Sequence, residues 1–475
     1  MNNHLSPKER LAIPRTQMPA QDPVIRSRNF SEVNLGLAEL AAIEEAQRCL
    51  LCHGRNCVSG CPVGVSIPEF VGNLASGNLT EAAGILQQDN ALPAVCGRVC
   101  PQESQCEAQC VRGKKGDPVA IGHLERFVAD WAMSHSENLD LPSNSKPSGK
   151  RVAVVGCGPA GLTVAGELVG KGHGITIFEA LHDTGGVLRY GIPEFRLPKE
   201  IIDIEVERLI DRGVKIECNV IIGKTLTLQD LQRDYDAIFL GNGAGLPVLL
   251  GIEGENLNGV YAANEYLTRV NLMGAGQTVN CSTPIIRGKK VAVIGAGNTA
   301  MDCVRTARRL GAEEAMIVYR REEAQMPARL EEVHHAKEEG VKFVMLSSPL
   351  AVIGDENDWV KALHCQKMAL GEADDSGRRR PVPIDGETFM LEADVVINAL
   401  GTSANPLLTS TVPELQLNRW GNITVNDEGA TNLPGVFAGG DIVRGGATVI
   451  LAMGDGKRAA HTIDNYLSTL PKTVS

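Results

Sequence analysis

The residues best suited to chemistry are cysteines: eight of the chain's 13 fall between Cys49 and Cys110, in two runs of four. The first run has the spacing Cys-x2-Cys-x4-Cys-x3-Cys-Pro, and the second has Cys-x3-Cys-Pro-x4-Cys-x3-Cys. Thiolates spaced in this way beside Cys-Pro are preferred ligands of iron–sulfur clusters. The spacing is close to the bacterial ferredoxin pattern but differs from it in the first run, where four residues instead of two separate the middle cysteines. We therefore expect two clusters that carry electrons into or out of a larger enzyme. The runs comprise Cys49, Cys52, Cys57 and Cys61, then Cys96, Cys100, Cys106 and Cys110.

Three other interpretations of these cysteines are zinc sites, a disulfide framework and unrelated buried thiols. Zinc also favours Cys-x2-Cys pairs. A disulfide framework needs an oxidising compartment, and the polar residues 1–10 show no apolar segment of a secretory signal. The spacing and the Cys-Pro context favour iron–sulfur clusters, and the expected compartment is the cytoplasm.

The composition limits the class of protein and its partners. A chain of 475 residues is long enough for about three domains. The 51 glycines and the aromatic content of 4% are typical of α/β proteins with many tight turns. The net charge of -11 argues against nucleic acid or an anionic membrane as the main partner. The sequence has no run of about 18 apolar residues, so a membrane-spanning helix is not expected.

The cysteines lie in a segment that should be mainly helical, from residue 31 to about 136. Helix-forming residues at helical spacing occupy 37–48, 67–88 and 124–133. Residues 1–30, rich in Pro, Arg and Gln, should form an extended arm, and 139–149 should form a linker.

After this linker, an apolar strand at 150–155 leads into a Gly-x-Gly-x-x-Gly fingerprint. Such glycines allow a tight turn, close approach of a pyrophosphate and close helix–strand packing. Glu179 ends the next predicted strand, about 20 residues further on, where an acid can accept hydrogen bonds from ribose hydroxyls. The pattern predicts a dinucleotide site. Its loop residues are Gly156, Gly158, Pro159, Ala160 and Gly161.

A similar unit returns at residues 289–300 and indicates an internal duplication. Here the strand that follows ends in Arg320 and Arg321 instead of an acid. Guanidinium groups bind phosphate and an acid would repel it, which favours NADP(H) over NAD(H); the alternative is a solvated basic turn. The loop residues of this second site are Gly295, Gly297, Asn298, Thr299 and Ala300.

The first site is expected to bind a flavin. A strand that ends in Gly440 and Asp441, and a helix start at Thr448 and Val449, are typical of flavoproteins with two dinucleotide sites. Gly185 and Gly186, with residues 190–193, should shape the flavin pocket. The predicted fold is α/β, with a helical iron–sulfur domain before two Rossmann-like domains. The predicted ranges are 1–149 for clusters and linker, 150–284 and 391–475 for FAD, and 285–390 for the inserted NADP(H) domain.

Four motifs together resemble the family of the glutamate synthase small (beta) subunit. They lie at residues 92–103, 191–198, 298–303 and 437–444. The same family includes the large subunit of NADH-dependent ferredoxin:NADP oxidoreductase and the N-terminal half of dihydropyrimidine dehydrogenase. The resemblance covers about residues 30–466 and does not identify the member.

The resemblance implies two [4Fe–4S] clusters whose ligands interleave the two cysteine runs. One cluster would use Cys49, Cys52, Cys57 and Cys110. The other would use Cys61, Cys100, Cys106 and a non-cysteine ligand at Glu125, which would otherwise be a helix-surface carboxylate. Cys96 would be a non-ligand packed near the flavin.

The function implied by the resemblance is hydride transfer from NADPH to FAD and single-electron transfer through the clusters to a partner subunit. The partner would be a larger glutamate synthase subunit or, alternatively, a smaller flavoprotein subunit, with ferredoxin as a further carrier. No side chain is needed as a catalytic acid or base, because the cofactors perform the chemistry. A remote alternative is a non-enzymatic scaffold that binds zinc and nucleotides. His173, His334 and His335 are expected on the surface.

Overall fold

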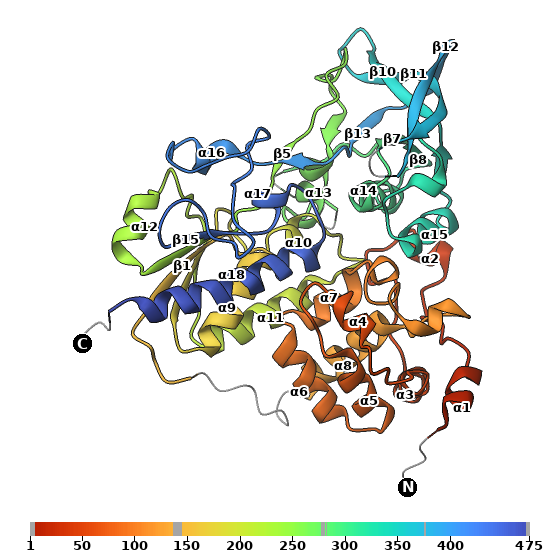
Figure 1. Ribbon diagram of the computed structural model, residues 1–475. Helices are drawn as coiled ribbons and strands as arrows, with labels where there is room; N and C mark the ends of the chain where they lie inside the picture. Colours follow the sequence, from red (N-terminus) through yellow and green to blue (C-terminus); the bar gives the residue numbers. More distant parts are fainter. Residues whose placement is uncertain (1–4, 136–144, 277–280, 282, 375–376, 472–475) are drawn as a thin grey trace.

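The computed structural model describes residues 5–135, 145–276, 281, 283–374 and 377–471. An N-terminal helical part packs against two α/β units, and the C-terminal helix α18 (Val449–Thr469) lies alongside α9 (Pro159–Gly170) of the first unit (Figure 1). Residues 139–144 of the predicted linker lie outside the described residues. Within the described ranges, no helix combines the length and apolar character needed to cross a membrane.

Residues 31–135 are mainly helical, as predicted. Residues 5–30, expected to form an extended arm, instead contain two short helices, which the Ser6 and Asp22 side chains cap. The single helix expected at 67–88 is two helices, because Gly77 takes a left-handed conformation with φ of +77°. Its N–H and that of Asn78 bond to the carbonyls of Leu74 and Asn73, a pattern that ends a helix. The helices here are α1 (Pro7–Ala12), α2 (Pro23–Arg26), α3 (Glu39–Gln47), α4 (Asn56–Ser59), α5 (Ile67–Ala75), α6 (Leu79–Asp89), α7 (Pro93–Val99), η1 (Gln102–Ser104), η2 (Val111–Lys114) and α8 (Ile121–Ser134).

The first α/β unit contains a five-stranded parallel sheet in the order β15-β4-β1-β2-β3. Residues 152–155 of β1 are buried on both faces of this sheet, which accounts for their continuous apolar sequence. One face carries α9 and α18. Its strands are β1 (Arg151–Val155), β2 (Gly174–Phe178), β3 (Lys215–Glu217), β4 (Ala237–Leu240) and β15 (Val436–Ala438), and its further helices are α10 (Val187–Tyr190), α11 (Lys199–Asp211), α12 (Leu228–Asp234), α16 (Pro406–Thr409) and α17 (Asp441–Arg444).

The second unit contains a parallel sheet in the order β6-β13-β7-β8-β9 and an antiparallel sheet in the order β10-β11-β12. A short pair, β5 (Leu246–Pro247) and β14 (Thr402–Ser403), joins the two chain crossings between the units. The remaining elements are β6 (Val260–Ala262), α13 (Ala263–Asn271), β7 (Lys290–Ile294), α14 (Asn298–Arg309), β8 (Glu314–Val318), η4 (Glu323–Gln325), α15 (Leu330–Glu338), β9 (Lys342–Val344), β10 (Ser347–Gly354), β11 (Val360–Ala373), β12 (Arg379–Glu392) and β13 (Val395–Asn398).

The parallel sheet of the second unit includes strands outside the range 285–390 that the sequence suggested for the NADP(H) domain. Strand β13 pairs with both β7 and β6, so β6 and β13 belong with the second unit and not with the first. The expected boundaries at 284/285 and 390/391 therefore cut through this sheet. The reason is that the strand beside the glycine-loop strand is supplied by a distant segment, which a local pattern does not reveal.

The close packing of α7 on α8 gives a test of the helical part. A Cβ on Gly97 would lie 2.5 Å from the backbone nitrogen of Arg126, whereas a Cβ on Gly84, in α6, would meet nothing within 4 Å. We expect Gly97→Ala to destabilise the protein by about 1–3 kcal/mol through overpacking. Gly84→Ala should be neutral or stabilise it by up to about 1 kcal/mol, because alanine favours helix. Thermal unfolding should give a melting temperature below the wild-type value for Gly97→Ala and a value equal to or above it for Gly84→Ala. Equal melting temperatures for the two variants would refute this packing argument.

Candidate cofactor sites

The loop after β1 has the shape of a pyrophosphate cradle. Gly156 has φ of +103°, and a Cβ on it would lie 2.5 Å from the Gly241 carbonyl oxygen. A Cβ on Gly161 would lie 2.0 Å from the Gly156 carbonyl oxygen, so α9 starts directly against the loop. By contrast, a Cβ on Gly158 would meet nothing within 4 Å. The loop is closed behind and open in front, which fits a pyrophosphate at the start of α9.

Glu179 follows β2 and is buried beside this loop. Its carboxylate oxygens accept hydrogen bonds from the backbone N–H groups of Cys157, at 2.8 Å, and Leu181, at 2.9 Å. Carboxylate oxygens can each accept more than one hydrogen bond. Glu179 therefore holds the glycine loop and retains capacity for a ribose hydroxyl.

The loop after β7 repeats this geometry. Gly295 has φ of +127°, and a Cβ on it would lie 2.5 Å from the Ala399 carbonyl oxygen. At the end of β8 the two arginines differ: Arg320 is exposed, whereas Arg321 is buried. Arg321 donates to the Arg379 carbonyl and to Asp374, both near the turn between β11 and β12. Arg321 thus holds the β-hairpin, and Arg320 stays accessible to solvent.

Both loops open into one cavity of about 780 Å³. Asp441 and the start of α18 form another part of its wall, and burial raises the pKa of Asp441 to about 6. The Thr448 hydroxyl caps α18 by accepting from the Leu451 N–H. Lining residues from the predicted sites are Gly156, Gly158, Pro159, Ala160, Glu179, Gly186, Gly297, Asn298, Thr299, Gly440, Asp441, Thr448 and Val449.

Other predicted residues lie outside the cavity lining. Gly161 and Gly295 pack against backbone carbonyls at the two loops, the Gly185 N–H donates to the Cys157 carbonyl, and Ala300 is buried in α14. Arg320 and Arg321 are also absent from the lining. Lining residues that sequence reasoning did not identify include Val99 and Pro101, on either side of Cys100, and Arg196 and Asp302. Asp302 follows Asn298 by four positions, one helical turn, and that spacing was the available signal.

The first group of thiols comprises Cys49, Cys52, Cys57 and Cys110. Burial, followed by the neighbouring thiols of Cys57, Cys110 and Cys52, raises the pKa of Cys49 to about 11. Leu51 and Arg55 adopt left-handed conformations, with φ of +49° and +45°, which are rare for residues other than glycine. These two tight turns bend the chain between its first three cysteines.

The second group comprises Cys61, Cys96, Cys100, Cys106 and Glu125. Burial and then the Glu125 carboxylate raise the pKa of Cys61 to about 11, and a hydrogen bond with Cys96 and then burial raise that of Cys100. Burial raises the pKa of Glu125 itself to about 7, and its Oε1 accepts from Asn90 at 2.8 Å. Cys96 also contacts the Met453 sulfur at 3.5 Å.

This second group contains all four ligands that the resemblance implied and also Cys96, so proximity alone does not choose between Cys96 and Glu125. Donor chemistry fits a cluster in both groups, because each offers at least three thiols. In the second group, Pro62 and Pro101 also follow Cys61 and Cys100 directly. In the parts of the chain that the structure describes, no three His, Cys, Asp or Glu side chains are arranged to hold a metal ion.

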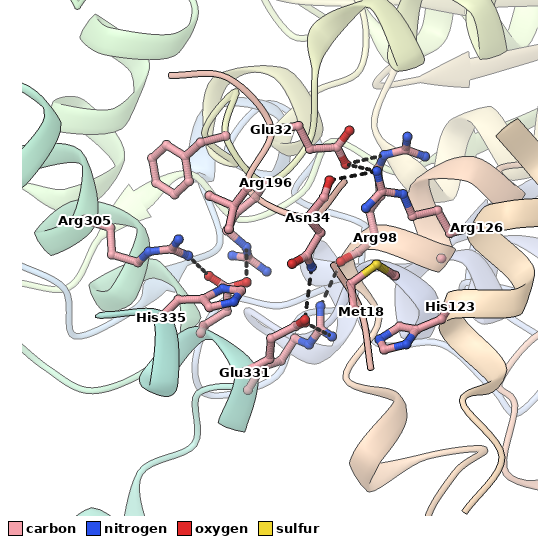
Figure 2. Close-up of a pocket in the computed structure, with 15 residues that line it drawn as sticks. Met18, Glu32, Asn34, Arg98, His123, Arg126, Arg196, Arg305, Glu331 and His335 are labelled. Carbon is pink, nitrogen blue, oxygen red and sulfur yellow. Dashed lines mark hydrogen bonds and ion pairs between the residues drawn. The ribbon is translucent and has the colours of Figure 1, made fainter. Parts of the chain in front are cut away.

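A second, much smaller cavity of about 20 Å³ lies where the N-terminal arm, α7, α8, α14 and α15 meet (Figure 2). Charged side chains dominate its wall: Glu32 accepts from Arg98 and pairs with Arg126, and Glu332 pairs with Arg196 and Arg305. His335, expected on the surface, is buried here, and His173 is buried between Ser148 and Asp464. Those two surface predictions are wrong, because helix packing that the sequence does not show covers both rings.

Two family models match the chain in consecutive segments. Residues 26–137 match dihydropyrimidine dehydrogenase domain II, 4Fe-4S cluster. Residues 150–456 match pyridine nucleotide-disulphide oxidoreductase. The first match includes both thiol groups, and the second includes both glycine loops.

Curated relatives cover nearly the whole chain. The glutamate synthase [NADPH] small chain of Escherichia coli is 38% identical over 95% of this chain and 97% of its own. The NADP(+)-dependent formate dehydrogenase subunit beta of Moorella thermoacetica is 40% identical over 86% of this chain, which spans only 60% of that longer protein.

Solved structures agree on the fold of the two α/β units. FprA of Mycobacterium tuberculosis in complex with NADPH has a TM-score of 0.58 and 21% identity, over 68% of this chain and 85% of that one. The chain therefore belongs to the family of the glutamate synthase small chain, and it is an NADPH-dependent oxidoreductase with 4Fe–4S, FAD and NADP(H) cofactors.

Proposed function

We propose that the chain is the electron-input subunit of a glutamate synthase, taking electrons from NADPH and passing them through its clusters to a larger subunit. The observation that carries this proposal is the shared cavity. Both glycine loops and the two residues that flank Cys100 line the same space. The proposed nucleotide site, the proposed flavin site and the loop around Cys100 therefore all border the same cavity.

The residues that would hold each cofactor follow from the geometry. Gly156–Ala160, Glu179, Asp441 and the start of α18 would hold FAD, and Gly297–Thr299 with Arg320 would hold NADP(H). When bound, these cofactors supply hydride acceptance and one-electron transfer. The chain itself orients them, excludes water from the space between them, and presents helix starts to their phosphates.

The two thiol groups would hold the clusters, with Glu125 as the fourth ligand beside Cys61, Cys100 and Cys106. The buried Asn90 amide bonds to Glu125 and fixes one of its oxygens. Such an outer hydrogen bond orients a ligating carboxylate. Cys96 would then be a buried thiol between the cluster and α18.

The partner proposed is a glutamate synthase large subunit, on the strength of the relative whose length this chain matches at 97%. The formate dehydrogenase relative is itself named as one subunit of an enzyme, which supports a need for a partner of some kind. A smaller flavoprotein that exchanges electrons with ferredoxin is the alternative.

The experiment combines the purified chain and NADPH with each partner in turn. Glutamate formation from glutamine and 2-oxoglutarate, only when a glutamate synthase large subunit is present, is the expected result. Ferredoxin reduction only with a small flavoprotein subunit would replace this proposal with the alternative. A colourless protein that contains zinc and no iron would refute both.

Arg320 provides a test of the NADP(H) site. We expect Arg320→Ala to raise the KM for NADPH about tenfold through loss of one charge-assisted hydrogen bond to the 2′-phosphate. The KM for NADH should stay unchanged, because NADH lacks that phosphate. Lys342→Ala, an exposed change on the neighbouring strand β9 that removes an ion pair with Glu314 at the start of β8, is the matched control. An equal rise for both nucleotides would contradict the assignment.

The second thiol group provides a test of cluster ligation. We expect Cys61→Ser to reduce the iron content from about eight to about four atoms per chain, since the carboxylate-ligated cluster loses a thiolate. Cys96→Ser should leave the iron content unchanged, while Glu125→Ala should change the electron paramagnetic resonance (EPR) spectrum of the reduced protein. Loss of iron in Cys96→Ser with none in Glu125→Ala would reverse the roles of these two residues.

A further inference from the structure

The nucleotide-binding loop of the second unit is fastened to the segment that precedes α15. Asn298 is the first residue of α14, and its Oδ1 accepts a hydrogen bond from the Arg329 backbone N–H at 2.9 Å. The bond uses only the main chain of Arg329. The side chain of Arg329 is therefore free to act elsewhere while its backbone stays beside the nucleotide loop.

That side chain reaches into the helical part and binds on both sides of Cys100. Its Nη1 donates to the Arg98 carbonyl at 2.8 Å, and its Nη2 donates to Gln102 Oε1 at 3.1 Å. The next residue adds a third link, because the Leu330 N–H donates to Glu103 Oε1 at 3.1 Å. One guanidinium thus holds the peptide before Cys100 and the side chain after it.

The Gln102 side chain, which accepts from Arg329, also contacts α7 and α8. Its Nε2 donates to the carbonyls of Cys96, at 3.3 Å, and Gly97, at 3.4 Å. A Cβ on Gly122 would lie 2.1 Å from the same Nε2, so the amide occupies space that only glycine leaves open on α8. Gly122 stands three positions before Glu125. One buried amide therefore bonds to the main chain of α7 at Cys96 and packs against α8 three positions before Glu125.

The chemistry of these contacts requires a guanidinium. Arg329 is 6% exposed, and its charge is balanced by Glu331, whose Oε2 accepts from Nη2 at 2.9 Å. Nη1 thus serves Arg98, and Nη2 serves both Gln102 and Glu331. A lysine ammonium carries the same charge but cannot present this planar set of donors.

We propose that Arg329 is a positioning residue that fixes the Cys100 loop, and the cluster it would ligate, against the nucleotide-binding loop at Asn298. Within the proposed function, this residue would set the relation between the electron inlet and the second cluster. It lies outside the cavity lining and is not a member of either thiol group. Its effect passes through Gln102 and the main chain around Cys100.

The test uses the full-length protein reduced with dithionite, so that neither NADPH nor a partner is needed. Arg329→Met and Arg329→Lys are compared with the wild type by EPR and by potentiometric titration of the signal that disappears in Cys61→Ser. Both variants should show an altered spectrum and a shifted midpoint potential for that cluster. The Kd for NADP+ should change by less than about threefold, because the backbone bond to Asn298 is kept.

Arg308→Met is the matched control, since Arg308 also donates to carbonyl oxygens, those of Ala312 and Glu313, but within its own unit. It should retain the wild-type spectrum and potential. Unaltered spectrum and potential in Arg329→Met would overturn the proposal. If that variant loses its iron, Arg329→Lys decides, and wild-type values there would overturn it equally. Because dithionite supplies the electrons, this outcome is independent of whether the chain oxidises NADPH.

Discussion

The arrangement of the three parts depends on a buried set of ion pairs around α14 and α15. Glu339 accepts from Arg305 and Arg309 of α14 and from Arg26 of the N-terminal arm, and Arg305 is fully buried. Burial alone would raise the pKa of Glu339, but the hydrogen bonds and charges of Arg309 and Arg305 lower it to about 2. Removing one member of such a buried pair costs about 3–5 kcal/mol, because the remaining charge has lost its partner. The network therefore penalises any displacement of the second unit.

The ion pairs around α14 and α15 extend to the wall of the shared cavity. Arg196 follows α10 in the first unit, and its guanidinium donates to both carboxylate oxygens of Asp302 on α14, at 2.7 and 2.9 Å. Both side chains line the cavity, and Arg196 also pairs with Glu332 on α15. The first unit is thus tied to α14 and α15 at the cavity wall by charge as well as by chain connectivity. In FprA a similar pair of α/β units is found, which shows a shared fold.

Features that depend on neighbours in the chain could be predicted from the sequence, and features that depend on distant segments could not. The glycine loops, Glu179 and the helical character of the cysteine segment are all local patterns. The position of β13 beside β7, the burial of His335, and the use of Arg321 by the β11–β12 hairpin all arise from long-range packing. Arg320 and Arg321 are adjacent and chemically identical, and only the fold separates them, because it leaves Arg320 exposed and buries Arg321.

The helical part and the first α/β unit share one hydrophobic core, which runs from Leu37 through Val152 to Leu467. The interleaved thiol groups lie against that core, and each draws on both cysteine runs. Neither group can assemble until residues 49–61 and 96–110 have come together. Metal binding to a site absent from the unfolded chain contributes directly to folding. Cluster binding should therefore stabilise the shared core, and with it the first glycine loop, so that a chain without clusters would have a weaker flavin cradle as well as no electron outlet.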